Sequence, residues 1–123
     1  MKLKNINGHI IPKSYNYYNL NTSLNYNIVS VYFINCLCNK NYLSWFMNQI
    51  NIIKDFSNKI YIVCVATNDI INIINNVILC NYSQINIEIE FHDLNEYEYR
   101  GILKVWEISK IYNLSTDIIL YIH

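Results

Sequence analysis

The most constraining feature of this sequence is a regular alternation between short runs of β-branched and aromatic residues and longer segments with the spacing of an amphipathic helix. Runs of the first kind are typical of buried strands, whereas apolar residues repeated at i, i+3, i+4 and i+7 are typical of helices that cover a sheet. The runs that predict strands are residues 28–35, 60–66, 87–92 and 117–123. The segments that predict helices are residues 42–56, 70–78 and 98–112.

Strands that alternate with helices are typical of right-handed βαβ crossovers, so we expect an α/β domain with a Rossmann-like parallel sheet. Residues 87–92 alternate apolar with charged side chains, which indicates an edge strand, whereas the other three runs are nearly continuously apolar. Numbering the strands along the chain, we predict the order 3-2-1-4. This order leaves strand 117–123 at the second edge despite its interior-like composition, and we expect the N-terminal leader, another chain or the rest of a larger domain to cover it.

The helical segments predict which side chains pack on the sheet. The segment Thr67-Asn68-Asp69 supplies N-cap chemistry for the second helix. The residues expected to face inward are Leu43, Phe46, Met47, Ile50, Ile53, Ile70, Ile73, Ile74, Val77, Ile78, Ile102, Val105 and Trp106.

Composition sets limits on the class of protein. The chain has 123 residues, of which 53% are hydrophobic and 15% charged, with two glycines and one proline, so collagen-like and disordered classes are excluded. Nine basic residues balance nine acidic ones without a basic stripe, which gives no electrostatic basis for binding nucleic acid.

Residues 1–26 are rich in Asn and Tyr and lack periodicity, so we expect an irregular leader followed by a single α/β domain over residues 27–123. No stretch has the length of a membrane span or the apolar core of a signal peptide, which predicts a cytoplasmic protein without a membrane span. Four cysteines are too few for a disulfide framework. Cys36 and Cys38 resemble half of a zinc site, but no second Cys/His pair accompanies them, so no metal site is predicted.

Open parallel sheets bind ligands beyond the carboxyl ends of their strands, where the strand order reverses. We therefore predict a nucleotide site formed by polar residues at those ends, with Arg100 at a helix start able to hold a phosphate. No glycine-rich dinucleotide fingerprint or P-loop is present. No catalytic residue is predicted, since His92 and Asp93 are adjacent on a strand and face opposite sides. The predicted nucleotide-binding residues are Asn35, Cys36, Thr67, Asn68, Asp69, Asp93, Arg100 and His123.

The last part of the chain carries a more specific pattern. Glu98-Tyr99-Arg100-Gly101, then Trp106-Glu107, then Asp117-Ile118-Ile119-Leu120-Tyr121-Ile122-His123 resembles a family of glycosyltransferase-like proteins. In that family a Glu-Tyr-Pro-Gly-Leu helix start and a Leu-Trp-Glu/Asp helix body lead into a strand that ends in Tyr-Phe-His-Ser-Lys-Gly. The match covers roughly the last 40 residues well and the earlier βαβ units loosely, and Arg100 stands where the family has proline.

The resemblance implies the N-terminal half of a GT-A glycosyltransferase fold that binds a nucleotide sugar, in a truncated or degenerate member. It allows a divalent cation, Mn²⁺ or Mg²⁺, with the nucleotide sugar, but the metal-binding acids are absent from this sequence. We therefore expect nucleotide or nucleotide-sugar binding without transfer by this chain alone. The alternatives are a small non-enzymatic α/β protein that pairs with itself or another chain through strand 117–122, and a flavodoxin-like or receiver-like domain.

Overall fold

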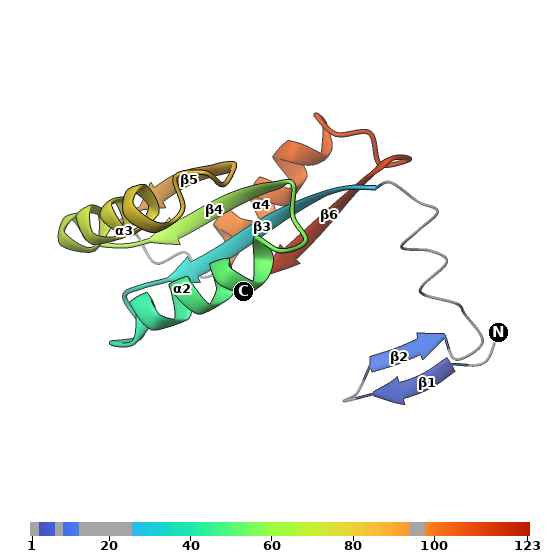
Figure 1. Ribbon diagram of the computed structural model, residues 1–123, viewed down its shortest axis with the longest axis horizontal. Coiled ribbons are helices and arrows are strands. Elements are labelled where there is room, and N and C mark those ends of the chain that lie inside the picture. Colours follow the sequence, from blue (N-terminus) through green and yellow to red (C-terminus); the bar gives the residue numbers. More distant parts are fainter. Residues whose placement is uncertain (1–2, 7–8, 13–25, 94–97) are drawn as a thin grey trace.

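A computed structural model describes residues 3–6, 9–12, 26–93 and 98–123. Its main element is a four-stranded, all-parallel sheet of order β5-β4-β3-β6, which confirms the predicted Rossmann-like α/β fold and the order 3-2-1-4 (Figure 1). The strands are β3 (Asn27–Asn35), β4 (Lys59–Val65), β5 (Ile87–His92) and β6 (Asp117–Ile122). The helices are α2 (Tyr42–Ile53), α3 (Asn68–Asn81) and α4 (Tyr99–Ser109).

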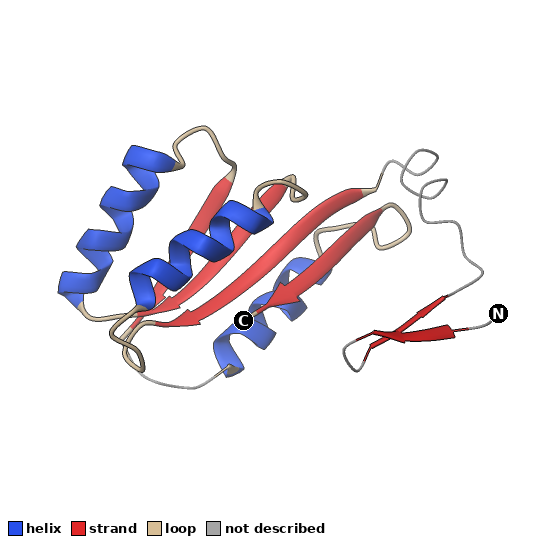
Figure 2. Cartoon of the chain, turned by 60° about the horizontal axis from the view of Figure 1, so that its bottom comes forward, coloured by secondary structure: helices blue, strands red, loops and turns tan. Residues whose placement is uncertain are grey.

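The helices cover both faces of the sheet, with α2 and α3 on one face and α4 on the other (Figure 2). On the first face, Phe46 of α2 and Ile74 of α3 pack against strand residues such as Ile62. On the second face, Ile108 of α4 packs against residues such as Val31. Successive residues of β3 and β4 point to opposite faces, so a continuous apolar run fills two cores at once.

β5 is an edge strand, as its alternation predicts. Ile89 and its apolar neighbours pack on the α3 face, whereas Glu90 points to the α4 face and accepts a hydrogen bond from Lys104 Nζ at 2.8 Å. His92 Nε2 lies 2.6 Å from the second Glu90 oxygen. Burial by itself raises the pKa of Glu90, but these two partners outweigh it and leave the pKa below its ordinary value.

The inward face of α4 differs from the predicted one. Val105 packs on the sheet as expected, but Ile102 and Trp106 are 57% and 59% exposed. Gly101 is buried against β6 and fixes the rotation of the helix, and this turns Ile102 and Trp106 to solvent. Ile73 of α3 is likewise 41% exposed, because the stripe predicted for that helix is wider than the surface that the sheet offers.

The leader is not irregular throughout. β1 (Leu3–Ile6) and β2 (His9–Pro12) pair as an antiparallel hairpin that forms a sheet of its own. Asn7-Gly8, the dipeptide between them in the sequence, is the strongest short-range hairpin signal. Residues 13–25 of the predicted leader lie outside the described residues. Within the described ranges, no helix is long and apolar enough to cross a membrane.

Candidate functional site

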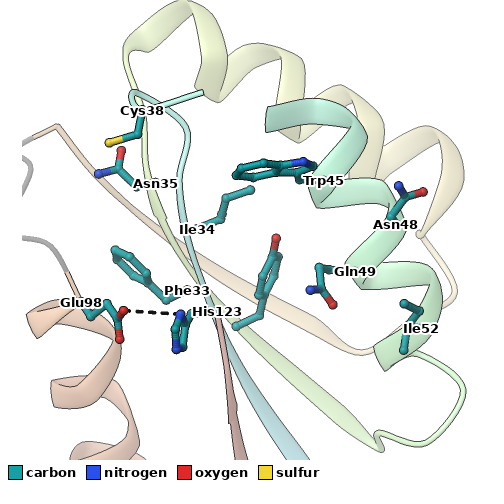
Figure 3. A pocket seen from close by; sticks show the side chains of 11 residues that line it. Phe33, Ile34, Asn35, Cys38, Trp45, Asn48, Gln49, Ile52, Glu98 and His123 are labelled. Carbon is teal, nitrogen blue, oxygen red and sulfur yellow. Dashed lines mark ion pairs between the residues drawn. The ribbon is translucent and has the colours of Figure 1, made fainter. Parts of the chain in front are cut away.

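A cavity of about 460 Å³ opens at the carboxyl ends of β3 and β6, between α2 and the start of α4 (Figure 3). Along the chain, β4 and β5 are added on one side of β3, and β6 is then added on its other side. The cavity therefore lies at the point where the strand order reverses. Aromatic, carboxamide and aliphatic side chains form most of the lining, together with one carboxylate and one imidazole. The described lining residues are Tyr32, Phe33, Ile34, Asn35, Cys38, Trp45, Asn48, Gln49, Ile52, Glu98 and His123.

One wall of the cavity is a face of α2. Trp45, Asn48, Gln49 and Ile52 recur at i, i+3, i+4 and i+7, so they share one side of the helix. The neighbouring side carries Phe46 and its buried companions, which anchor α2 to the sheet. Trp45 is 54% exposed, and its indole therefore presents a surface on which a planar ligand can stack.

The floor of the cavity comes from the end of β3. Tyr32 is almost completely buried and packs beside Phe46, with ring centroids 6.3 Å apart. Tyr32 also lines the cavity. Burial raises the pKa of Tyr32 above its ordinary value, so the hydroxyl stays protonated and can donate to a ligand in the cavity.

The opposite wall contains a paired carboxylate. Glu98 Oε1 lies 3.4 Å from His123 Nδ1 (Figure 3). Glu98 Oε2 accepts a hydrogen bond from the Tyr121 hydroxyl at 3.4 Å. The Tyr121 and His123 rings are 5.7 Å apart, centroid to centroid. Burial, and then the negative charge of Glu98, raises the pKa of Tyr121 to about 12. Tyr121 therefore remains a hydrogen-bond donor at neutral pH and holds Glu98 at the rim of the cavity.

Two of the eight predicted site residues, Asn35 and His123, line the cavity. Asn35 Oδ1 also accepts a hydrogen bond from the Leu37 amide, which shapes the turn after β3. Cys36 is buried, with its sulfur 3.6 Å from that of Cys64, and contributes to the core rather than to the lining.

The other five predicted residues lie at the same edge of the sheet but outside the cavity lining. Thr67, Asn68 and Asp69 are exposed at the start of α3, beyond the end of β4, and the Thr67 side chain makes no capping hydrogen bond. Asp93 is exposed after β5. Arg100 lies in the first turn of α4. The predicted set therefore lies along the edge of the sheet at which the cavity opens, and it extends beyond the cavity lining towards β5.

The set of residues predicted from the sequence includes neither the wall formed by α2 nor Glu98. The wall had a signal that could have been used. Phe46, Ile50 and Ile53 of α2 pack in the core. The neighbouring side of the helix still carries Trp45 and Ile52. Large apolar residues on the exposed side of a helix indicate a binding surface. For Glu98 no such signal exists, because its partners His123 and Tyr121 are more than 20 residues away in sequence.

The cavity does not fit a divalent cation. Mg²⁺ and Mn²⁺ require several oxygen ligands, and Glu98 is the single carboxylate among the described lining residues. Across the described residues, no three His, Cys, Asp or Glu side chains gather as a metal site requires. No step of chemistry is therefore assigned to a metal.

Comparison with known proteins adds no relative: no family model, no curated protein and no solved structure matches this chain. The resemblance to glycosyltransferase-like proteins therefore depends on the sequence pattern alone.

Proposed function

We propose that the cavity between α2 and α4 binds the nucleoside part of a nucleotide or nucleotide sugar. The observation that carries the proposal is the position of the cavity at the carboxyl ends of β3 and β6, the switch point at which open parallel sheets bind nucleotides. The resemblance of residues 98–123 to glycosyltransferase-like proteins supports the same class of ligand.

The lining suits a base and a ribose. Trp45 offers an exposed aromatic face for a base, and such stacking contributes on the order of 1–3 kcal/mol in single-stranded nucleic acid complexes. Asn48 and Gln49 on the same wall carry both donors and acceptors and can pair with the edge of a base. Glu98, on the opposite wall, can accept hydrogen bonds from ribose hydroxyls, as acidic residues do in dinucleotide-binding folds.

The phosphates would lie at the mouth of the cavity. α2 and α4 both begin at this edge of the sheet, and a helix N-terminus favours an anion through its free N–H groups and dipole. Lys40 precedes α2 and Arg100 lies in the first turn of α4, so each helix start carries a basic residue.

The proposal concerns binding and includes no transfer step. Glu98 is already paired with His123 and Tyr121, and the described lining offers neither a second carboxylate nor a set of metal ligands. A carboxylate held in this way is better suited to positioning a ligand than to accepting a proton from one.

The two tryptophans of the chain provide the test. Trp45 lines the cavity, whereas Trp106 is similarly exposed on α4 but does not line it. A Trp106→Phe variant retains Trp45 as its only indole, and titration with UDP or GDP should change its fluorescence in a saturable way. A Trp45→Phe variant retains Trp106, and its fluorescence should stay constant.

Uridine and guanosine should give the same change with weaker affinity, because they keep the stacking group and lose the phosphates. Inorganic phosphate alone should give none. The proposal is wrong if no nucleotide or nucleoside changes the Trp45 signal, or if the change is equally large in the Trp45→Phe variant.

A further inference from the structure

The outer edge of β6 presents backbone groups that no described strand pairs with. The Asn27 amide donates to the Thr116 carbonyl at 3.2 Å, and Asn27 is opposite Asp117 in the parallel register. In a parallel ladder the residues of one strand point their N–H and C=O groups alternately towards and away from the partner. Ile118, Leu120 and Ile122 therefore bond to β3, while Asp117, Ile119 and Tyr121 direct their N–H and C=O groups to the free edge.

The sequence of β6 is complementary to itself when read antiparallel about Leu120. Leu120 then lies opposite the same residue of a second copy, and Ile119 lies opposite Tyr121. Asp117, whose carboxylate accepts the Asn113 amide at 2.8 Å in its own chain, lies opposite His123, which lies 3.4 Å from Glu98. Opposite polarity at the two ends and apolar residues between them satisfy the pairing preferences of neighbouring strands.

The same register satisfies the backbone. Ile119 and Tyr121 both direct their N–H and C=O groups outward, so in this arrangement each exchanges both of its hydrogen bonds with the other in the second copy. The faces also agree: Ile118 lies opposite Ile122, and both side chains are on the α2 side in both copies. A slip by one residue would place apolar side chains on the wrong face, and a slip by two would remove the contact between Asp117 and His123.

We infer that β6 pairs antiparallel with β6 of a second copy of this chain, centred on Leu120, to form a continuous sheet across a two-fold axis. An unpaired apolar edge otherwise needs charges, a proline or a bulge to keep it from associating, and β6 has none of these between Asp117 and its end at Ile122. Such an interface is isologous, as two-fold symmetry requires. The inference depends on the sheet edge and not on the cavity, so it does not require nucleotide binding.

The test compares the oligomeric state of the full chain with that of a Leu120→Lys variant by sedimentation velocity over a range of concentrations. Leu120 is outside both buried clusters, so the monomer should tolerate the change, whereas in the dimer two like charges meet on the symmetry axis. The unchanged chain should sediment as a dimer, and the variant should dissociate at least about tenfold more readily. A Leu79→Lys variant makes the same charge change at an exposed position of α3 and should remain dimeric.

A charge exchange tests the register itself. His123→Asp places an acid opposite Asp117 in the dimer, and also beside Glu98 in the monomer, and should weaken the dimer. Adding Asp117→Lys, which gives up the contact with the Asn113 amide, should restore the dimer in variants that circular dichroism shows to be folded. This pair of variants also decides the question if Leu120→Lys fails to fold, as judged by circular dichroism. The inference is overturned if the unchanged chain is monomeric at every concentration, if a folded Leu120→Lys variant stays dimeric, or if the charge exchange restores nothing.

Discussion

Gly101 of α4 lies directly against Tyr121 of β6: a Cβ atom at Gly101 would lie 2.6 Å from the Tyr121 hydroxyl oxygen and 2.9 Å from its ring. A glycine inside a helix ordinarily costs about 0.5–1 kcal/mol relative to alanine, so it needs a reason to be there. Because Gly101 has no side chain, the start of α4 packs closely against β6. This close packing brings Glu98 within hydrogen-bond distance of Tyr121.

Gly101→Ala should therefore destabilise the protein, although helix propensity alone favours alanine. We expect the free energy of unfolding to fall by about 1–3 kcal/mol, the range for overpacking a filled site. Chemical denaturation measures it. Adding Tyr121→Phe removes the nearest atom and should restore part of the loss, whereas a gain in stability for Gly101→Ala would contradict the close contact.

The raised pKa of Tyr121 predicts a dependence of stability on alkaline pH. The folded pKa of about 12 exceeds the ordinary value of 10.0, so folding favours the protonated phenol. Its contribution is fully present below about pH 10 and is lost as the pH rises towards 12. NMR titration of the Tyr121 ring should show this pKa.

Glu98→Gln removes one of the causes of that shift and should lower the pKa of Tyr121, while burial keeps it above the ordinary value. Glu107→Gln is the control. It neutralises an acid of α4 that pairs with Lys104 and not with Tyr121, so it should leave the Tyr121 titration unchanged. An unchanged titration in the Glu98→Gln variant would show that the carboxylate does not act on Tyr121.

Lys104 has a structural role on the second face of the sheet. The Lys104 side chain is 16% exposed. Its ammonium group donates a hydrogen bond to Glu90 and lies 5.6 Å from the centre of the Tyr61 ring. Lys104→Met should lower the free energy of unfolding by about 1–3 kcal/mol, because Glu90 then loses its principal partner. Lys110→Met removes an exposed cation over Trp106 and should cost at most about 1 kcal/mol.

The same variant should be more sensitive to acid. In the unchanged protein the pKa of Glu90 lies below 4.5, so its contribution to stability is present above that pH and is lost as the pH falls through the folded pKa. Without Lys104, burial raises that pKa, and the midpoint of acid unfolding should move to higher pH. An unchanged midpoint would mean that Lys104 does not lower the pKa of Glu90.

The order of the strands was predictable: the residues of one segment place β5 at an edge, and the order typical of doubly wound sheets then places β6 at the other edge despite its interior-like composition. The alternation of Ile87, Ile89 and Phe91 with polar residues is enough to place β5 at an edge. The rotation of α4 was not predictable, since it depends on a contact between Gly101 and Tyr121 across 20 residues, and the helical stripe alone favours Ile102 and Trp106 as the inner face. The topology likewise predicted the edge of the sheet at which the cavity opens. Predicting the residues that line the cavity would have required knowing which side of α2 does not pack in the core.

The four cysteines should divide into two reactive and two protected thiols. Cys38 and Cys80 are exposed, whereas Cys36 and Cys64 are buried against each other. The hydrogen bond between Cys64 and Cys36 and burial both raise the pKa of Cys64, so its thiolate is scarce at neutral pH. A thiol reagent should modify Cys38 and Cys80 rapidly in the native protein, and the other two after unfolding. Equal rates at all four positions would contradict this burial.

The most direct test of the proposed binding site uses these two exposed thiols. Cys38 lines the cavity and Cys80 lies on α3 outside its lining, so one experiment contains both probe and control. The modification rate at each thiol is followed by mass spectrometry with and without a saturating concentration of UDP or GDP. We predict that the nucleotide slows modification of Cys38 and leaves Cys80 unchanged; equal rates at Cys38 with and without nucleotide would contradict binding in the cavity between α2 and α4.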